Sequence, residues 1–435
     1  MCEISSWLDQ GQIQQCLTGI SSRDVLLNLQ EAILIQAQAY DYDIAIVGAG
    51  PSGLCFAKAL EQSGLRVVVL ERQSEAAFAA PAFDGREIAL THHSASVMQQ
   101  IGIWQHMPTD AISSLRDARV LNGHSRYAME IDHRDSSKQA LGYLVSNCLI
   151  RQAAYQAVQS ASSVTILTET QITHVQTDAD GASITLASGE VITASLLVAA
   201  DSRFSETRRM MGISASMHDF GRVMMVCAMS LEKPHEQVAW EWFDYGQTLA
   251  MLPMNDKRAS IVVTMTAREI QDLMLLDEAD FSRDIMQRFQ HRLGEMKLVS
   301  TRHAYPLVTV YPDRFVANRF AVIGDAAVGM HPVTAHGFNF GLHGAAHLAS
   351  LIQEAQLSGK DIADTRLLAR YARAHRLATR PLFLATHMIA KLYSDDTPPA
   401  RLLRTASLHI GNHVAPFKRA VTKMLTESRS LSPFR

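Results

Sequence analysis

The chain has 435 residues, a formal net charge of −3 and 47% hydrophobic residues, which is enough for two domains or for one large domain with a sizeable insertion. The near-neutral charge gives no global sign of nucleic-acid binding. The five cysteines have no metal-ligand spacing, and their odd number does not suggest a disulfide framework, so we expect a reducing, cytosolic setting and no metal site.

Residues 1–41 come first and are expected to form a helical extension. Apolar side chains recur at about helical spacing between positions 22 and 38. The first residues lack the basic segment and the apolar run of a signal peptide. No stretch of about 18 uncharged apolar residues occurs further along, so we expect no transmembrane helix.

The clearest local pattern is a βαβ unit that begins at residue 43. Residues 43–47 form a short apolar run rich in β-branched side chains, which predicts a buried parallel strand. An apolar helical stretch through Leu60 and a second apolar strand at 66–70 complete the unit. The turn between the first strand and the helix carries Gly48, Gly50 and Gly53, and Glu71 follows the third glycine by 18 residues.

This glycine turn, in its strand–helix context, is typical of a dinucleotide-binding site. Gly48 permits the tight turn, Gly50 lets the backbone approach a pyrophosphate, and Gly53 allows close packing of helix on strand. The helix N-terminus offers N–H groups to the phosphates, and Glu71 is expected to bind ribose hydroxyls, which argues against NADP. A glycine turn without a ligand is the alternative, and the motif alone does not separate FAD from NAD. The candidate cofactor-binding residues here are Gly48, Gly50, Ser52, Gly53, Glu71 and Arg72.

The rest of the chain follows a different pattern. Alternating segments at 164–198 and 222–265 predict antiparallel strands, and helical stretches follow near 268–275 and 278–293. A short apolar strand at 320–323 leads into a mainly helical region that extends to about residue 412. We expect breaks in that region at Pro332, Pro381 and Pro398–Pro399.

A second motif lies at the end of the 320–323 strand. Asp325 is placed where its carboxylate could bind a ribityl hydroxyl of a flavin. Gly337 and Gly341 flank the start of the next helix, whose N-terminus could stabilise negative charge on a reduced flavin. Taken alone, the segment is also compatible with an ordinary strand–loop–helix crossover.

Together these motifs resemble the single-component flavoprotein hydroxylases typified by para-hydroxybenzoate hydroxylase. In that group GxGxxG binds the ADP moiety of FAD, and the Gly-Asp at the strand end contacts its riboflavin part. A third family motif serves both FAD and NAD(P)H; here Asp201, Ser205 and Arg208 match it, whereas Ser202 replaces the usual glycine. The resemblance therefore implies FAD as the cofactor and NAD(P)H as the co-substrate.

Within that group, residues 42–427 are most similar to the ubiquinone-biosynthesis hydroxylases. The segments that carry this resemblance include 84–90, 141–145, 250–253 and 319–327. The resemblance implies that further FAD contacts come from Arg86, Arg151, Gly337 and Asn339. Without the family, each of the two arginines would be interpreted as a surface or salt-bridging residue.

One departure from the family pattern lies beside the predicted flavin. Ala335 and His336 replace the usual Gly and Gln, and the run Thr334-Ala335-His336-Gly337-Phe338-Asn339 is similar to that of a bacterial subgroup, the 5-demethoxyubiquinol hydroxylases. His336 is the candidate catalytic residue. The alternative is a histidine at a helix start that bonds to the backbone.

The resemblance implies an α/β fold with an α+β insertion: a Rossmann-like FAD-binding domain of the glutathione reductase type, interrupted by a β-sheet substrate domain. A helical C-terminal region is expected to cover both. The expected divisions are an N-terminal extension at 1–41, an FAD-binding domain at 42–115, 141–220 and 300–360, a substrate domain at 116–140 and 221–299, and a C-terminal region at 361–435.

The resemblance also implies the reaction. NAD(P)H reduces FAD, the reduced flavin reacts with O₂, and a flavin C4a-hydroperoxide transfers one oxygen to an electron-rich aromatic ring. The expected substrate is a polyprenylated phenol or quinol of ubiquinone biosynthesis. The alternatives are hydroxylation of another small aromatic compound, a flavin reductase without oxygen insertion, and a member that binds FAD only as a scaffold.

A polyprenylated substrate implies contact with a membrane. Residues 400–424 interleave apolar and basic side chains, Arg401 and Arg404 among them, as do helices that lie on an anionic membrane. The alternative is that the apolar set packs on the FAD-binding domain while the basic set faces solvent. We expect a cytoplasmic protein, peripheral at the inner face of the membrane, that also contacts other ubiquinone-biosynthesis proteins.

Overall fold

The computed structural model describes residues 40–125, 127–136, 138–255, 257–332, 337–395, 397–413 and residue 422. The chain divides into a unit of residues 1–41 and a unit of residues 42–435, and nearly all described residues belong to the second. The helix predicted near positions 22–38 lies outside the described residues.

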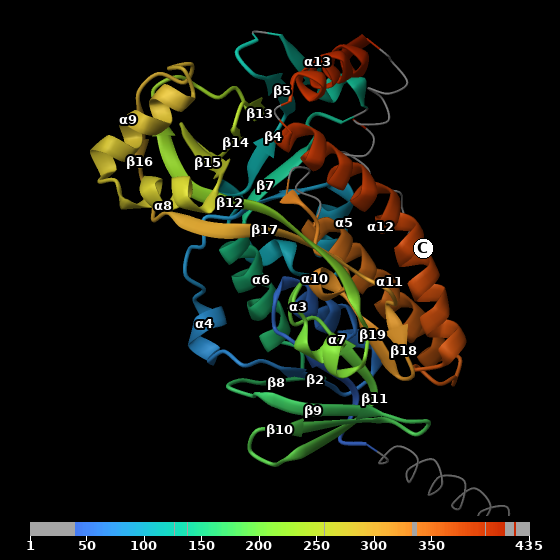
Figure 1. The fold of residues 1–435 in the computed structure, drawn as a ribbon. Coiled ribbons are helices and arrows are strands. Elements are labelled where there is room, and N and C mark those ends of the chain that lie inside the picture. Colours follow the sequence, from blue (N-terminus) through green and yellow to red (C-terminus); the bar gives the residue numbers. More distant parts are fainter. Residues whose placement is uncertain are drawn as a thin grey trace, which may run out of the picture. The chain divides into compact units, whose positions relative to one another are not determined.

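The predicted βαβ unit forms the centre of an eight-stranded sheet (Figure 1). Its strands are β1 (Tyr42–Val47), β2 (Val67–Leu70), β8 (Val164–Leu167), β9 (Ile172–Thr177), β10 (Ala182–Leu186), β11 (Val191–Ala199), β18 (Val316–Ala317) and β19 (Phe320–Val322). The main order is β18-β19-β11-β1-β2-β8, with β1 parallel to both β2 and β11. Every residue of β2 is buried, as expected for a parallel strand that is covered on both faces. β9 and β10 extend β11 as an antiparallel meander.

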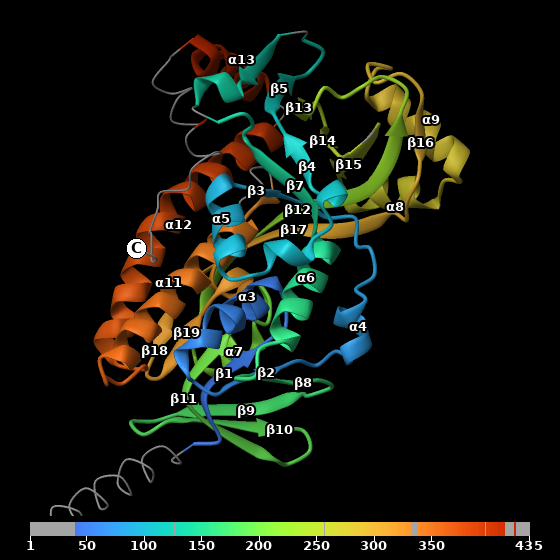
Figure 2. The same cartoon turned by 180° about the vertical axis from the view of Figure 1, so that it is seen from behind.

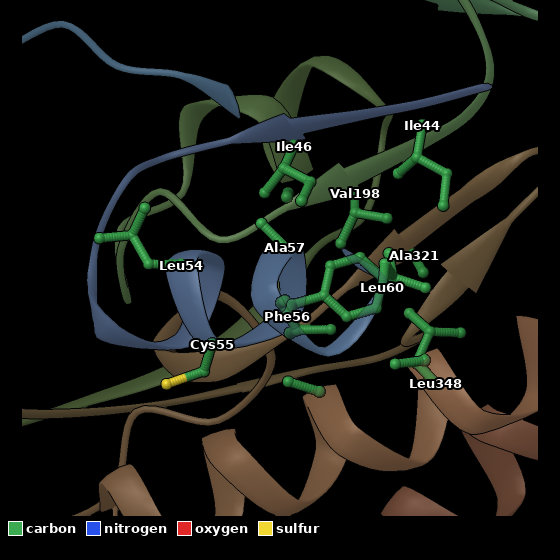
Figure 3. Close-up of a cluster of buried hydrophobic side chains, with 14 of the residues drawn as sticks. Ile44, Ile46, Leu54, Cys55, Phe56, Ala57, Leu60, Val198, Ala321 and Leu348 are labelled. Atoms are coloured by element: carbon green, nitrogen blue, oxygen red, sulfur yellow. The ribbon is translucent and has the colours of Figure 1, made fainter. Parts of the chain in front are cut away.

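Helix α3 (Pro51–Ala59) contacts β1 and β2 and lies between α6 (Asn147–Gln159) and α11 (Gly337–Leu357), as Figure 2 shows from behind. In Figure 3, Leu54, Phe56 and Ala57 of α3 lie beside Ile44 and Ile46 of β1, with Leu348 of α11 beyond them; all six side chains are fully buried. This core fixes the N-terminus of α3 at the carboxyl ends of β1 and β11.

A second sheet contains most of the remaining strands. They are β5 (Asp117–Asn122), β6 (Ala128–Ile131), β12 (Ala215–Leu231), β13 (Val238–Asp244), β14 (Gln247–Pro253), β15 (Arg258–Met265), β16 (Met296–Leu298) and β17 (His303–Pro312). The order is β16-β12-β15-β14-β13-β5-β6, and β17 also pairs with β12. Helices α8 (Ala267–Leu275) and α9 (Glu278–Arg288) cover one face, where Phe281 and Ile285 pack with Trp242. We call this the outer face, and the opposite face the inner face.

A small third sheet connects the two. It consists of β3 (Glu87–Leu90), β7 (Gly142–Ser146) and β4 (Ser113–Leu115), all antiparallel, and β4 contacts β14 of the second sheet. The remaining helices are α4 (Glu75–Ala79), α5 (His92–Gln100), α7 (Glu206–Met210), α10 (Gly324–Ala327), α12 (Thr365–Ser394) and α13 (Pro398–His413), with short 3-10 turns at Glu61–Ser63, Trp104–His106, Thr109–Ala111 and His133–Asp135.

These sheets confirm the predicted α/β class, in which a parallel nucleotide-binding sheet is interrupted by a second, antiparallel sheet. The division into an FAD-binding and a substrate domain stays a prediction. β17 pairs within the second sheet, although the predicted division counts residues 300–360 with the FAD-binding domain.

Two helix predictions need correction. α9 ends at Arg288, before the predicted end at residue 293, because Gln290 and His291 adopt left-handed φ angles of 53° and 57°. The break predicted at Pro381 is wrong, because Pro381 lies inside α12, a continuous helix of 30 residues. Pro381 has no N–H to donate to the carbonyl four residues earlier, on Leu377, and Leu377 is 69% exposed, so water can replace that donor.

In the part of the chain that the structure describes, none of the helices combines the length and the apolar character needed to cross a bilayer.

Candidate functional site

The glycine turn between β1 and α3 has the geometry that its sequence predicts. Gly48 has a φ of +105°, and a Cβ on it would lie 2.7 Å from the carbonyl oxygen of Ala200 at the end of β11. A Cβ on Gly53 would lie 2.1 Å from the Gly48 carbonyl oxygen, so helix and turn touch there. At Gly50 a Cβ would meet no atom within 4 Å, and no side chain caps the N-terminus of α3. The turn therefore presents open space in front of uncapped helix N–H groups.

Glu71 lies at the same turn. Its Oε2 accepts a hydrogen bond from the backbone N–H of Ala49 at 2.8 Å, and its Oε1 accepts one from the N–H of Gln73 at 2.9 Å. Arg151, on α6, donates to the Gln73 side chain at 3.2 Å. The structure thus brings Arg151 to the segment that follows Glu71, whereas Arg72 between them is exposed.

Three segments far apart in the sequence converge at Ser52. A Cβ on Gly324, where φ is +60°, would lie 2.7 Å from the Ser52 side chain. A Cβ on Gly341 would lie 2.8 Å from Ser52 Oγ and 3.0 Å from the Cα of Gly324. Only glycine fits at both positions, so the starts of α3, α10 and α11 approach more closely than side chains would allow.

Asp325 forms an ion pair that the sequence did not predict. Its Oδ2 lies 3.1 Å from Nη2 of Arg203, and Nη1 of Arg203 donates to the carbonyl oxygen of Val308. Arg203 belongs to the third motif, but only the fold reveals its contact with Asp325, because 122 residues separate the two. The Asp325 side chain remains 42% exposed and can accept further hydrogen bonds.

Asp201 and Arg208 anchor the third motif. Asp201 Oδ2 accepts hydrogen bonds from the N–H and the hydroxyl of Thr207, both at 3.2 Å. Its Oδ1 is buried and has no partner among the described residues. Arg208 donates to the carbonyl oxygen of Ala326 at 2.9 Å and so ties the motif to α10. This buried carboxylate oxygen can accept a hydrogen bond from a bound ligand.

Arg86 is held by its own loop. Its guanidinium lies 2.7 Å from the Asp84 carboxylate and 5.4 Å from the ring centre of Tyr305. Asn147 also donates to Asp84, at 2.8 Å, and the Tyr305 hydroxyl donates to the Asp84 carbonyl oxygen at 2.7 Å. The loop thus connects the third sheet with β17 of the second.

Asn339, near the start of α11, is fully engaged with β3. Its Oδ1 accepts from the N–H of Thr91 at 3.0 Å, and its Nδ2 donates to the carbonyl oxygen of Ala89 at 2.8 Å. Gly337 begins α11, and a Cβ there would meet no atom within 4 Å. The candidate catalytic residue His336 lies outside the described residues.

An aromatic cluster that the sequence reasoning missed surrounds His331. Its ring lies 4.8 Å from that of Phe220 on β12, and the Phe220 ring lies 5.4 Å from that of His387 on α12. Burial lowers the pKa of His331 to about 4, and nearby His387 adds to the effect. No sequence signal joins these residues, because they come from three separate elements.

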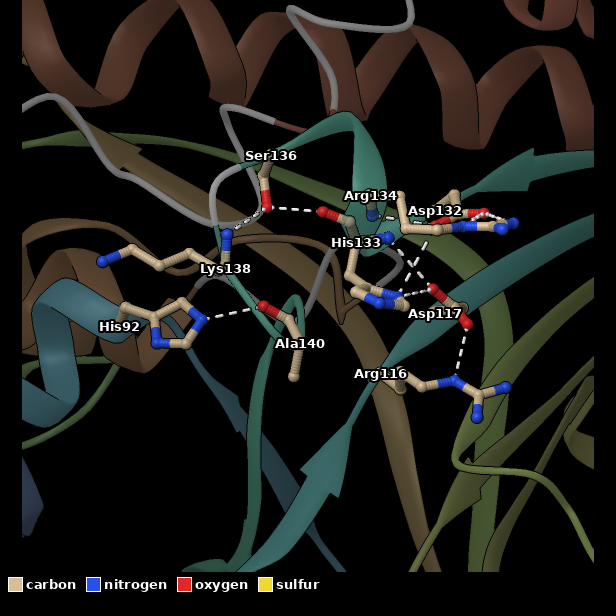
Figure 4. Close-up of polar contacts among 9 residues, drawn as sticks. All are labelled: His92, Arg116, Asp117, Asp132, His133, Arg134, Ser136, Lys138 and Ala140. Carbon is tan, nitrogen blue, oxygen red and sulfur yellow. Dashed lines mark hydrogen bonds and ion pairs between the residues drawn. The ribbon is translucent and has the colours of Figure 1, made fainter.

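Another polar cluster lies on β5 and the turn after β6 (Figure 4). The ligand atoms of Asp117, Asp132 and His133 lie within 4.8 Å of one another. Both carboxylates already accept hydrogen bonds. Asp117 accepts from His133 and from Arg116, and Asp132 accepts from Arg134. These contacts account for the cluster as a structural tie between the strands.

One basic residue of α13 does not face solvent or a membrane, contrary to the prediction for the basic residues of 400–424. Arg404 is fully buried and donates to the carbonyl oxygens of Leu392 and Asp395. It therefore satisfies the last turn of α12 instead of facing solvent. Arg401 stacks on the Tyr245 ring at 3.8 Å.

Known proteins similar to this chain agree with the geometry. A family model described as an FAD binding domain matches residues 41–382. The ubiquinone hydroxylase UbiM of Neisseria meningitidis is 46% identical over 388 residues, which are 88% of this chain and 84% of the relative. The ubiquinone hydroxylase UbiL of Rhodospirillum rubrum is 31% identical over 391 residues, 90% and 91% of the two chains. The crystal structure of p-nitrophenol 4-monooxygenase PnpA from Pseudomonas putida has the same fold, with a TM-score of 0.72 at 17% identity, covering 89% of this chain and 99% of that one.

Proposed function

Because the chain belongs to the ubiquinone hydroxylases of the FAD-binding family, we propose that the residues converging on the glycine turn hold its FAD. The protein is an FAD-dependent monooxygenase that hydroxylates an aromatic ring in ubiquinone biosynthesis. The observation that carries the proposal is the convergence of Ser52, Gly324 and Gly341 beside the open space at Gly50. When bound, FAD supplies the redox and oxygen chemistry, with NAD(P)H as the electron donor.

Each candidate residue has a place in this proposal. The α3 N-terminus at Gly50 receives the pyrophosphate, with Gly48, Ser52 and Gly53 shaping the turn, and Glu71 the adenosine ribose. Asp325 accepts from a ribityl hydroxyl, with Arg203 fixing its carboxylate. The N-terminus of α11 at Gly337 faces the flavin ring and favours negative charge there. Arg72, Arg86, Arg151 and Asp201 complete the set, and Asn339 positions α11 against β3.

The proposed substrate is a polyprenylated phenol or quinol. The UbiM and UbiL relatives are both named ubiquinone hydroxylases, and Val120, Ala250, Val262 and Val226 form an apolar row across the inner face of the second sheet. The narrower resemblance to 5-demethoxyubiquinol hydroxylases rests on residues 334–339, of which 334–336 lie outside the described residues. The ring position therefore stays a prediction.

We also propose that α12 brings the protein to an anionic membrane surface. The exposed apolar residues Leu377, Leu384 and Met388 recur at helical spacing, at 69%, 49% and 70% exposure. Arg373, Arg380 and Lys391 are exposed on the same helix. An apolar stripe with basic neighbours suits the interface of an anionic bilayer, where a polyprenylated substrate would be dissolved.

The experiment for the FAD site compares the wild type with Gly50→Val. A Cβ at this position would meet no protein atom within 4 Å, and Gly50 has an ordinary φ of −68°, so the variant should fold. The valine side chain would fill the space proposed for the pyrophosphate, so FAD should be absent. We expect a yellow wild type that releases FAD on denaturation and a colourless, folded variant. A folded variant with normal FAD content would refute this placement.

The activity test follows NADH and NADPH oxidation with and without a short-chain prenylated phenol, and looks for added oxygen by mass spectrometry. We expect a hydroxylated product whose formation depends on the phenol. Oxidation without product would favour the flavin reductase instead.

A further inference from the structure

The inner face of the second sheet carries one carboxyl group in an apolar row. Neighbouring strands align Val120, Glu241, Ala250, Val262, Val226 and His303 across the sheet, from β5 through β13, β14, β15 and β12 to β17. Directly paired residues project from the same face. Their sequence neighbours Trp242, Met251, Ile261, Val263 and Met225 form the core under α8 and α9. Glu241 therefore points away from that core.

The inner face is turned toward the proposed FAD site. A Cβ on Gly85, the residue before Arg86, would lie 2.7 Å from Cγ2 of Val226 and 3.3 Å from the His303 ring. At the other end of the face, the ring of Phe243 contacts that of Tyr393 on α12, with 3.8 Å between ring centres. Glu241 lies on the inner face between these two contacts. Three strand spacings, about 14 Å, separate it from Val226.

Glu241 has no partner within the described part of the chain: no described residue gives it a hydrogen bond or an ion pair. The side chain is half-buried, and burial raises the pKa of its carboxyl to about 8. On the same face, the Ser260 hydroxyl is buried and also lacks a partner among the described residues. A polar group without a hydrogen-bond partner on an apolar face lowers the stability of the fold. Contacts within the folded chain, as far as the structure describes it, therefore do not account for Glu241 and Ser260.

Charged neighbours do not explain the raised pKa of Glu241, because burial is its one cause. Titratable residues on the inner face or on elements packed against it include Arg222, Arg258, His303, Tyr305, Glu87, Tyr393, Arg401, Arg404 and His409. None of them is among the causes of the shift. A phenol such as a tyrosine side chain ionises near pH 10. A carboxylate with a raised pKa is better matched to that proton than an ordinary one.

We propose that Glu241 is the catalytic base that accepts the proton of the substrate's ring hydroxyl. The inference rests on the proposed function and assigns one of its steps. The substrate O–H bond breaks, the proton forms an O–H bond with the Glu241 carboxylate, and the electron pair stays on the ring oxygen. The resulting phenolate is more electron-rich at its ortho and para carbons, where oxygen is inserted. After insertion, the proton returns to the ring oxygen of the product.

The test compares Glu241→Gln, Glu241→Asp and the wild type, each with its FAD content measured. Glu130→Gln is the matched control, because Glu130 lies on β6 of the same sheet with a side chain that is 58% exposed. For the wild type and the control we expect kcat/KM to rise with pH and level off above about pH 8. Glu241→Gln should lower kcat about a hundredfold or more, with little change in KM and without that rise. Glu241→Asp keeps a carboxyl and should retain the rise at a lower rate.

A second readout needs no turnover. A short-chain prenylated phenol is bound to the oxidised, FAD-loaded protein, and its ultraviolet difference spectrum is followed against pH. In the wild type the bound phenolate should appear well below the pH at which the free phenol ionises; in Glu241→Gln it should not. Equal pH profiles and equal phenolate spectra in the two proteins would overturn the role of Glu241. A wild type that hydroxylates no prenylated phenol would overturn the proposed function, while the spectrum still decides about Glu241.

Discussion

At the scale of single residues, Asp325 tests the flavin end of the site. Replacing Asp325 by Ala removes one charged acceptor and leaves Arg203 without its carboxylate, while the glycine turn stays intact. We expect FAD affinity to fall by about 1–3 kcal/mol, measured by fluorescence titration of the apoprotein. Asp361→Ala is the control, because it also removes the carboxylate partner of an arginine, Arg319, from a side chain that is 45% exposed. Equal affinity in the wild type and Asp325→Ala would show that the flavin lies elsewhere.

Glu87 gives a pH-dependent prediction at the same scale. Burial is the main cause that raises the pKa of its carboxyl from 4.5 to about 8, and its Oε1 has no partner among the described residues. A raised folded-state pKa means that the folded state holds the proton more tightly. Its contribution to stability is therefore complete below pH 4.5 and is lost as pH rises to about 8. The wild type should lose stability over that range.

The Glu87→Gln variant should lose less, because an amide does not ionise. We expect its unfolding midpoint to exceed that of the wild type at pH 8.5 by more than at pH 5, with both proteins loaded with FAD. Glu190→Gln, at an exposed turn position, should track the wild type at both values. The same pH dependence in Glu87→Gln and the wild type would contradict the assignment.

Residue roles that depend on local sequence could be predicted, and those that depend on distant contacts could not. Gly48, Gly50 and Gly53 are recognisable because turn, approach and packing all lie within one strand–helix connection. The pairing of Arg203 with Asp325 and the isolation of Glu241 depend on which strands become neighbours. The order of strands in a sheet cannot be read from the local sequence.

At the scale of elements, α12 offers a test of the membrane proposal. Leu384→Asp with Met388→Asp places two charges on its exposed stripe without touching a buried position. We expect the wild type to sediment with vesicles containing anionic lipid, less with neutral ones and less in high salt. The double variant should remain in the supernatant with unchanged FAD content. Co-sedimentation of the double variant equal to that of the wild type would rule out this face.

The elements also show where propensity and context diverge. The capping box of Thr266 and Glu269 at the start of α8 is visible in the sequence and present in the structure. By contrast, a proline normally ends a helix, yet Pro381 lies within α12. Its exposed side lets water take the place of the missing donor. Whether a proline is tolerated inside a helix therefore depends on the exposure of the carbonyl that loses its donor, and this exposure is set by how the helix packs.

At the scale of the whole molecule, the pathway assignment predicts a metabolic effect. We expect deletion of the gene, in a strain without a compensating paralogue, to remove mature ubiquinone from lipid extracts. A prenylated precursor that lacks one ring oxygen should accumulate and be seen by mass spectrometry. Restoring the wild-type gene should reverse both changes, and Gly50→Val should not. Normal ubiquinone in the deletion strain would contradict the pathway assignment but not the flavin chemistry.

The convergence of Ser52, Gly324 and Gly341 has a consequence for how the holoenzyme is made. These three positions leave the ribosome at very different times, and Asn339 must also reach back to β3. A nascent chain that contains the glycine turn but not yet α10 and α11 lacks the segments proposed to contact the flavin end of the cofactor. Contacts so distant in sequence form slowly. FAD capture is therefore expected after synthesis of α11, and chains that stop before it should accumulate without cofactor.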